Sequence, residues 1–392
     1  MTIPSIRLIR LIRFDYSFDS IDSFARSRAD EKYARPLPRS TSTRSILSEM
    51  VSVGNNLPRF GLGLAALGRP GYINLNRDVV FGAVGTEGRQ LEGMQNRADE
   101  VMGALIAECS KRKAATGDSL TPWFDCARSY GLSERFVGEY LRNKNVKRED
   151  VYVSSKWGYT YVADWNVALK DGAPHEVKDH SVDNFLMQLR ETEKELGAYV
   201  NLYQVHSATF ESGILTDGRA HEALAKCREE RGWSIGLSVS GTVQDEIIRT
   251  AMKIKTADGG RLFDSVQCTF NVLEQKPGPA LLDAHEAGMD IIIKEGMANG
   301  RALKSDTIQS LAKKMGYNPD ALALAAILAQ PFQPRVLSGA VTPEQLTSNL
   351  EALEISKKLA SEDGKVALDE IMEGCRMESE QYWYDRGALA WN

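Results

Sequence analysis

From residue 59 onward, short apolar runs alternate with longer segments of helical periodicity. This alternation is typical of parallel strands joined by crossover helices. The strand-like runs are RFGLGLAAL (59–67), PWFDC (122–126), VYVSSK (151–156), NLYQVH (201–206), WSIGLS (233–238), FDSVQCT (263–269), DIIIK (290–294) and RVLSG (335–339). Because there are eight such units, we predict an α/β fold, a closed (β/α)8 TIM barrel that spans residues 59–392 with a C-terminal helix and an aromatic tail packed against it.

A doubly wound sheet is the competing fold, and its test is a G-x-G-x-x-G turn that leads from the first strand directly into a helix. The nearest candidate is FGLGLAALG (60–68), where the third glycine comes too late and the next helical pattern begins far downstream. The dinucleotide-binding fingerprint is therefore absent. We expect Gly61 and Gly63 to relieve the backbone in or beside the first barrel strand.

Composition and charge exclude several functional classes. Of the 392 residues, 43% are hydrophobic and 26% are charged, which is the composition of a globular protein with a large core. The net charge is -5 and no Lys/Arg-dense stripe follows the N-terminus, so nucleic acid is excluded as a partner. No run approaches the ~20 consecutive apolar residues of a membrane span, so no membrane partner is expected.

The five cysteines are an odd number and lie far apart in the sequence. None forms a C-x-x-C pair or has a histidine at zinc-ligand spacing. We therefore predict reduced, packed thiols in a reducing compartment and no metal site.

The first 58 residues differ from the rest of the chain. MTIPSIRLIRLIR is basic and amphipathic, and RPLPRSTSTR is rich in Ser, Thr, Arg and Pro, which is typical of a transit peptide. The segment also contains several acidic residues, which such peptides usually lack. We expect residues 1–58 to form a disordered or surface-packed extension of a cytoplasmic protein, with organelle targeting as the alternative.

Polar side chains end most of the predicted strands. In a (β/α)8 enzyme the active site is built at the carboxyl ends of the strands. A Lys and a His that close apolar strands at the same rim as a carboxylate indicate a functional site. The polar residues at or near these ends are Asp125, Lys156, His206, Ser238, Gln267, Lys294 and Ser338.

Asp125, Tyr130, Lys156 and His206 together form a set suited to proton transfer. We expect Lys156 to bring the pKa of the Tyr130 phenol closer to neutral and Asp125 to keep that ammonium charged in a partly dry site. His206 would donate a hydrogen bond to a substrate oxygen and orient it toward the phenol. Because the set contains no evident nucleophile or metal ligands, a hydride-carrying cofactor is the natural complement.

A helix start after the eighth strand offers a place for such a cofactor. In VLSGAVTPEQLTSN (336–349), Thr342 stands as the N-cap, Pro343 as the first helical residue and Glu344 in the first turn. Backbone N–H groups there would form an anion site in the loop where barrels often bind phosphate.

With these residues in order, the chain resembles the aldo-keto reductase superfamily over most of residues 59–358. FDCARSYG resembles the family segment that carries an aspartate and a tyrosine, VSSKWG its lysine strand and YQVHS its histidine strand; GLSVSG, QCTFNVLEQ, IIKEGMANGR and VLSGAVTPEQLTSN follow in the family's order. The resemblance implies NAD(P)(H)-dependent interconversion of a carbonyl (an aldehyde, ketone or aldose) and an alcohol, with Tyr130 as the general acid/base. It also implies a set of cofactor-binding positions, namely Ser238, Gln267, Lys294, Met297, Asn299, Gly339, Thr342, Gln345 and Asn349.

The chain departs from the family pattern at three places. Val239 stands where many members have an asparagine, and Lys294 stands where many members stack an aromatic ring on the nicotinamide. Gly339, Val341 and Gln345 occupy places where basic residues commonly bind the 2'-phosphate of NADP. The cofactor prediction is therefore NADP(H) or NAD(H), with a slight preference for NADP(H).

The segment 157–179 is a long insertion after the third strand, and we expect its aromatic residues to form a substrate wall, Trp157 above all. Two other functions fit the same residues. One is a cofactor-bound regulatory or partner-binding subunit with little turnover. The other is an aldolase or isomerase that uses Lys156 as a Schiff-base amine.

Overall fold

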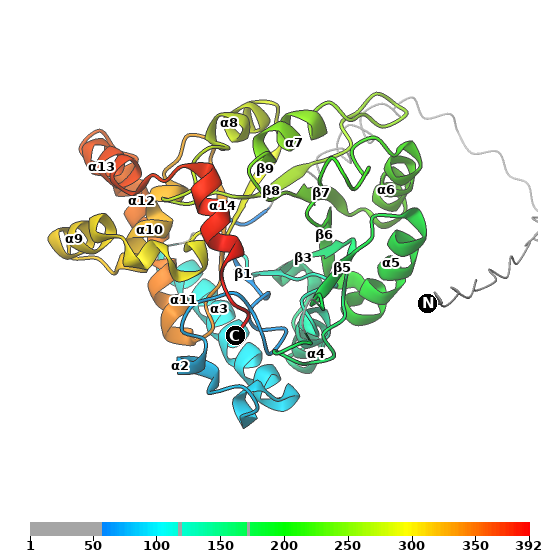
Figure 1. Cartoon of the computed structure of the whole chain (residues 1–392), viewed down its shortest axis with the longest axis horizontal. Coiled ribbons are helices and arrows are strands. Elements are labelled where there is room, and N and C mark those ends of the chain that lie inside the picture. The colour runs from blue at the N-terminus through cyan, green and yellow to red at the C-terminus, as the bar shows by residue number, and fades with distance from the viewer. Residues whose placement is uncertain (1–56, 117–119, 171–172) are drawn as a thin grey trace, which may run out of the picture. The chain divides into compact units, whose positions relative to one another are not determined.

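The computed structural model describes residues 57–116, 120–170 and 173–392. The predicted extension, residues 1–58, lies outside the described residues except for its last two positions. Eight parallel strands close into a barrel in the order β1-β10-β9-β8-β7-β6-β3-β2 (Figure 1). The strands are β1 (Phe60–Gly63), β2 (Trp123–Asp125), β3 (Tyr152–Trp157), β6 (Val200–Val205), β7 (Ser234–Ser238), β8 (Ser265–Thr269), β9 (Asp290–Lys294) and β10 (Arg335–Ser338). The predicted (β/α)8 barrel is confirmed.

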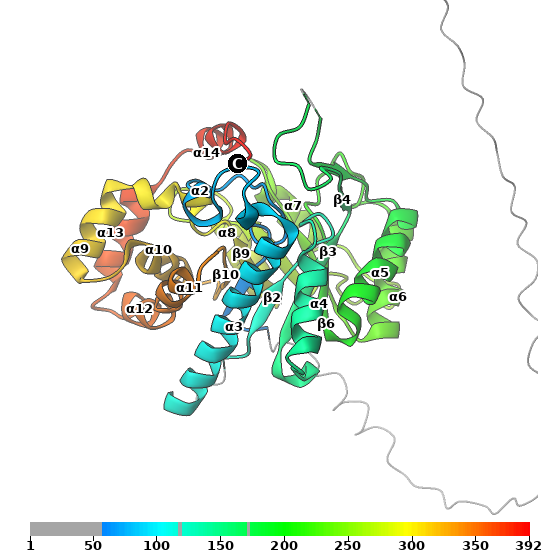
Figure 2. The same ribbon diagram turned by 90° about the horizontal axis from the view of Figure 1, so that it is seen from below.

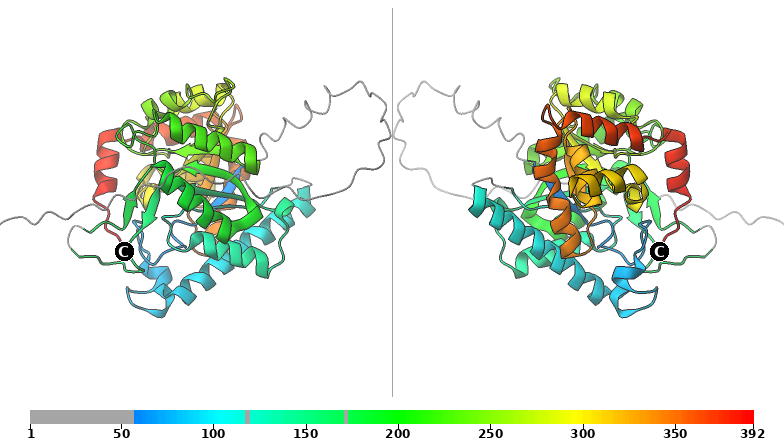
Figure 3. Two further views of the ribbon diagram at one scale, coloured as in Figure 1. Left: turned by 90° about the vertical axis from the view of Figure 1, so that its right-hand side faces the viewer. Right: turned by 90° about the vertical axis from the view of Figure 1, so that its left-hand side faces the viewer.

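Helices surround this barrel and connect its strands (Figures 1 and 3). Local sequence fixes many of their ends: Asp217 caps α6 by accepting hydrogen bonds from two backbone N–H groups, and Gly232 ends that helix in the left-handed region at φ 66°. The α-helices are α2 (Asp78–Phe81), α3 (Leu91–Thr116), α4 (Ser133–Asn143), α5 (Val182–Leu196), α6 (Gly218–Arg231), α7 (Gln244–Ala251), α8 (Gly278–Glu286), α9 (Asp306–Met315), α10 (Pro319–Leu328), α11 (Pro343–Leu350), α12 (Ala352–Leu359), α13 (Lys365–Cys375) and α14 (Ser379–Gly387).

The insertion after β3 contains a small antiparallel hairpin that the sequence pattern does not predict. Its strands are β4 (Tyr159–Tyr161) and β5 (Glu176–Lys178). The hairpin, α2 and α14 lie at the same end of the barrel (Figure 2). This end carries the cavity described below, so the insertion and the C-terminal segment both add to the walls of that cavity.

Besides the main hydrophobic core, the barrel strands form a second, smaller cluster of buried apolar side chains. It includes Trp123, Leu202, Ile292 and Leu337. The Trp123 ring leaves no room for a side chain at Gly61, because a Cβ added there would overlap the indole carbons. Gly63 meets no such obstacle, since its nearest neighbour would be a carbonyl oxygen 3.5 Å away. Glycine is therefore required at Gly61 by the packing of a side chain, and not by the backbone relief expected for Gly61 and Gly63, neither of which has a positive φ.

Replacing Gly61 with alanine should lower the free energy of unfolding by about 1–3 kcal/mol, because the methyl group displaces a packed indole. Gly63→Ala, two residues along the same strand, is the matched control and should cost less. Urea unfolding of both variants measures the difference. Equal stability of the two variants would contradict the packing argument.

Three predictions about what the chain lacks can be compared with the described residues. No helix among them is both long enough and apolar enough to span a membrane. No group of three or more His, Cys, Asp or Glu side chains in the described part of the chain could hold a metal ion. All five cysteines are described, and each is buried and free of disulfide bonds.

Candidate active site

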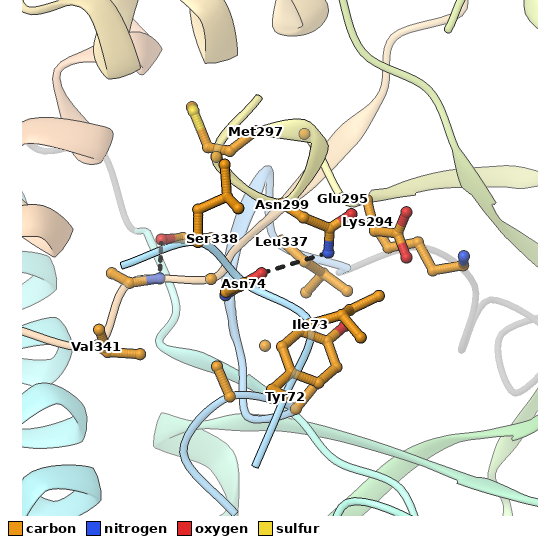
Figure 4. Close-up of a pocket in the computed structure, with 18 of the residues that line it drawn as sticks. Tyr72, Ile73, Asn74, Lys294, Glu295, Met297, Asn299, Leu337, Ser338 and Val341 are labelled. Carbon is orange, nitrogen blue, oxygen red and sulfur yellow. Dashed lines mark hydrogen bonds between the residues drawn. The ribbon is translucent and has the colours of Figure 1, made fainter. Parts of the chain in front are cut away.

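A cavity of about 960 Å³ opens at the carboxyl ends of the barrel strands. Figure 4 shows part of its wall, where Lys294 at the end of β9 and Glu295, Met297 and Asn299 after it face Tyr72–Asn74 from the loop after β1. Six of the eight strands contribute the residue at or directly after their carboxyl end, namely Gly63, Asp125, His206, Ser238, Lys294 and Ser338, and β8 contributes Gln267 from its middle. The fold therefore gathers in one place side chains that are far apart in the sequence.

Asp125 and Lys156 form an ion pair beneath this cavity. The parallel register pairs Asp125 with Ser154, so Lys156, two residues on, points from the same face of the neighbouring strand. Lys156 Nζ donates to Asp125 Oδ2 at 2.5 Å and to the carbonyl oxygen of Cys126 at 2.9 Å. Ser154 Oγ donates to Asp125 Oδ1 at 2.7 Å. Both charged groups are almost fully buried, and these hydrogen bonds offset the cost of burying them.

These contacts bear on the Schiff-base alternative. The Lys156 side chain is 0% exposed and does not line the cavity. Its ammonium is directed to a carboxylate and a carbonyl oxygen instead. A carbonyl substrate in the cavity would therefore not meet this amine, and nothing in the geometry favours an aldolase or isomerase.

Tyr130 lies in the loop after β2 and lines the cavity. The Lys156 ammonium lies 4.8 Å from the centre of its ring. Burial, reinforced by the Asp125 carboxylate, raises the pKa of the Tyr130 phenol well above its ordinary value. This contradicts the expected lowering of that pKa by Lys156, because burial outweighs the charge and the ammonium is already paired with Asp125. At neutral pH the phenol is protonated and is a proton donor.

His206 directly follows β6, and its ring lies edge-on to Tyr130 at a centroid distance of 5.4 Å. Its Nδ1 lies 3.3 Å from Ser129 Oγ. Burial, together with the charges of Lys156, Lys294 and Arg69, lowers the pKa of His206 well below its ordinary value. The imidazole is therefore neutral at neutral pH and can donate one hydrogen bond without carrying a charge.

Most of the predicted cofactor-binding residues line the same cavity. They are Ser238, Gln267, Lys294, Met297, Asn299, Gly339, Gln345 and Asn349. Gln267 Oε1 and Asn299 Oδ1 are buried oxygens that accept no hydrogen bond from the described residues. Such acceptors are rare in protein interiors and favour a bound group that carries N–H or O–H donors.

The predicted anion site at the start of α11 is only partly available. Thr342 is the N-cap as predicted, because its side chain accepts from the Gln345 backbone N–H. However, the Ala340 N–H donates to Ser338 Oγ at 3.1 Å and the Val341 N–H donates to Gln345 Oε1 at 2.9 Å. Two of the loop amides are therefore occupied by protein oxygens, and Thr342 itself does not line the cavity.

Lys294 lines the cavity at the end of β9. Its ammonium donates to Ser240 Oγ at 2.9 Å and to Thr269 Oγ1 at 2.7 Å. Burial lowers the pKa of Lys294 to about 8. The side chain is thus a cation held by two hydroxyl groups, where the family resemblance leads one to expect an aromatic ring.

Trp157 is not part of the cavity wall, so its predicted role as the leading substrate residue is wrong for this geometry. The strand β3 continues through residue 157, and because Lys156 points inward, the next side chain points outward toward the helices. The indole is 0% exposed and packs on Phe185 of α5 at a centroid distance of 4.9 Å. Tyr159 from the same insertion lines the cavity instead, with its ring 5.0 Å from that of His206.

Three further segments complete the cavity wall, and the sequence pattern does not identify their residues. Arg69 comes from the loop after β1, Glu176 from β5 and Trp391 from the C-terminal tail. The Trp391 ring stacks on that of His175 at 3.9 Å, and the backbones of Tyr72 and Asn392 exchange two hydrogen bonds of 3.1 Å. The expected packing of the tail on the barrel is therefore observed, and it takes place at the cavity.

The model of the Aldo/keto reductase family matches residues 80–367. Solved structures with the same fold include an aldo-keto reductase of Bacillus halodurans in its holo form, which is 18% identical with a TM-score of 0.55 and covers 83% of this chain and 95% of its own. A glycerol dehydrogenase of Gluconobacter oxydans is 18% identical with a TM-score of 0.57, covering 82% and 93% of the two chains. An aldose reductase of Giardia lamblia is 18% identical with a TM-score of 0.52, covering 82% and 94%. The curated proteins include no match to this chain.

Proposed function

Because the chain belongs to the aldo/keto reductase family, we propose that it interconverts a carbonyl and an alcohol by hydride transfer with NAD(P)(H), using Tyr130 as the general acid/base. One observation carries the assignment of residues. The Tyr130 phenol and the His206 imidazole line one cavity together with Asp125, which forms a buried ion pair with Lys156.

Each of these four side chains has a distinct role in the proposed reaction. Tyr130 gives its proton to the carbonyl oxygen during reduction and takes it back during oxidation. His206 donates a hydrogen bond to the same oxygen, and because it is neutral it does not compete as the acid. Lys156 stabilises the phenolate that forms, and Asp125 keeps the ammonium in place.

The cavity residues also fit the nicotinamide cofactor that the family uses. The acceptors Gln267 Oε1 and Asn299 Oδ1 would receive hydrogen bonds from amide or hydroxyl groups, and Ser238 lies beside Gln267 in the barrel register. When bound, the cofactor supplies or accepts the hydride. The protein supplies its binding site and the proton.

The loop after β10 contains no basic side chain at Gly339, Val341 or Gln345. A charge-assisted hydrogen bond to the 2'-phosphate would be worth about 1.5–3 kcal/mol, or roughly tenfold to a hundredfold in affinity. Without it, we expect the dissociation constants of NADPH and NADH to differ by less than about tenfold. Titration of the protein with both nucleotides, followed by fluorescence, measures the ratio.

Lys304 lines the cavity and is exposed, so its ammonium is the side chain to test for a contact with the 2'-phosphate. The ratio of the two dissociation constants in the Lys304→Gln variant shows whether this contact creates a preference for NADPH. A strong NADPH preference that survives this change would contradict the charge argument. Equally weak, non-saturating binding of both nucleotides would count against the proposed enzyme as a whole.

A further inference from the structure

Arg69, in the loop after β1, has the most unusual surroundings of the charged residues in the cavity wall. Its side chain is only 3% exposed, yet it lines the cavity beside Tyr130, with the guanidinium carbon 5.4 Å from the centre of the Tyr130 ring. The guanidinium also contacts the ring of Trp391 at 4.8 Å. It is thus in contact with aromatic rings from the loop after β2 and from the C-terminal tail.

Only part of this guanidinium is used by the protein. Nε donates to the carbonyl oxygen of Ala65 at 3.3 Å, and Nη1 donates to the carbonyl oxygen of Ser129 at 2.9 Å and to the Glu176 carboxylate. Nη2 makes no hydrogen bond to any described residue, and it is not among the fully enclosed unpaired atoms. A nitrogen with two N–H donors is therefore open to the cavity next to the proposed proton donor.

The balance of charge at this end of the cavity is positive. Three of the four carboxylates that line the cavity already have a cation: Asp125 pairs with Lys156, Glu176 with Arg69, and Glu295 with Arg386. The fourth, Asp320, accepts hydrogen bonds from Ser348 and Asn349. Lys294 lines the same cavity, and its hydrogen bonds go to two hydroxyl groups. It forms no ion pair within the described part of the chain. Arg77, whose guanidinium donates only to backbone carbonyl oxygens of the described residues, also lines the cavity. The cavity wall thus carries positive charge that no carboxylate of the described chain pairs with.

We infer that the substrate of this enzyme is an oxo acid or a sugar acid, whose carboxylate accepts hydrogen bonds from Arg69 Nη2 while its carbonyl lies at Tyr130 and His206. This inference rests on the proposed function and narrows its substrate class. A guanidinium is the side chain best suited to a carboxylate, and the low exposure of Arg69 strengthens the interaction.

The test compares carboxylates with their neutral amides, which have nearly the same size and shape. The pairs are D-glucuronate with D-glucuronamide, glyoxylate with glyoxylamide, and succinic semialdehyde with 4-oxobutanamide. The measured quantity is the ratio of kcat/KM for acid over amide, because a general loss of activity cancels in this ratio. In at least one pair, the wild-type protein should prefer the acid by about tenfold to a hundredfold, as expected for a charge-assisted hydrogen bond.

Three variants separate recognition from folding. Arg69→Gln should bring the ratio close to one. Glu176→Gln leaves Arg69 intact but removes its ion-pair partner, so the ratio should rise. Arg190→Gln, the same change at an exposed position on α5 outside the cavity, should leave the ratio unchanged.

Two results would overturn the inference. A wild-type ratio near one in all pairs, with turnover still dependent on Tyr130, would remove the substrate class and leave the proposed function intact. If no compound is turned over, calorimetric titration of the NADPH-loaded protein with D-glucuronate and D-glucuronamide decides, and equal or absent binding of the two rejects the carboxylate site. Loss of nucleotide binding as well would reject the proposed function itself.

Discussion

Tyr130→Phe should lower kcat for carbonyl reduction by about a hundredfold to ten-thousandfold, because general acid catalysis contributes an effect of this size. The phenol is protonated at neutral pH and lines the cavity, so it is the proton donor best placed for the reaction. Phenylalanine keeps the aromatic ring and its contacts with Lys156 and His206. Steady-state kinetics with a carbonyl panel, read by nicotinamide absorbance, measures the loss.

Nucleotide affinity and stability should remain close to wild type in this variant, because only one hydroxyl group is removed. Tyr140→Phe on α4 is the matched control, since it makes the same change at a residue that does not line the cavity. Full activity in Tyr130→Phe would reject the assignment of the proton donor. Full nucleotide binding without turnover in the wild-type protein would instead favour a regulatory or partner-binding subunit.

Lys156→Met should lower the free energy of unfolding by about 3–5 kcal/mol, because it leaves the Asp125 carboxylate buried without its cation. Lys156 and Asp125 are 0% and 2% exposed, so water cannot compensate for the loss. Turnover should fall as well, since the phenolate of Tyr130 loses its stabilising charge. Urea unfolding and steady-state kinetics give the two quantities separately.

The double variant Lys156→Met/Asp125→Asn should recover most of the stability but not the activity, because it removes both buried charges. Lys226→Met is the control for the loss of an ion pair as such: its pair with Glu230, at 3.6 Å, is exposed and should contribute less than about 1 kcal/mol. If the double variant were as unstable as Lys156→Met, the buried charge would not be the cause. If it kept full activity, the proposed role of Lys156 would be wrong.

Features with a short-range cause could be predicted from the sequence. The strands follow from their apolar runs, and the N-cap at Thr342 follows from the residues next to it. Asp125 and Lys156 could be brought together because parallel strands end at the same rim of a barrel. Trp157 was misplaced because β3 ends one residue later than its apolar run suggests. The side chain after the inward-pointing Lys156 therefore still belongs to the strand and points to its other face.

Features that depend on tertiary contacts could not be predicted. Arg69 looks like an ordinary surface arginine in a Gly/Pro-containing loop, and only its contacts with Glu176 and Trp391 show that it is buried. The pKa of Tyr130 likewise depends on how completely the assembled cavity excludes water, which a sequence does not show. In both cases the deciding partners are distant in the chain.

Three residues of the cavity wall lie outside the segment that matches the family model, residues 80–367. Arg69 and Tyr72 precede this segment in the sequence, and Trp391 follows it. The four proposed catalytic residues all lie inside that segment. Changes in the flanking segments can therefore alter which molecules enter without touching the proton-transfer groups. The chemistry and the choice of substrate can thus diverge separately during evolution, and two relatives with the same barrel can acquire different metabolic roles by exchanging only their ends.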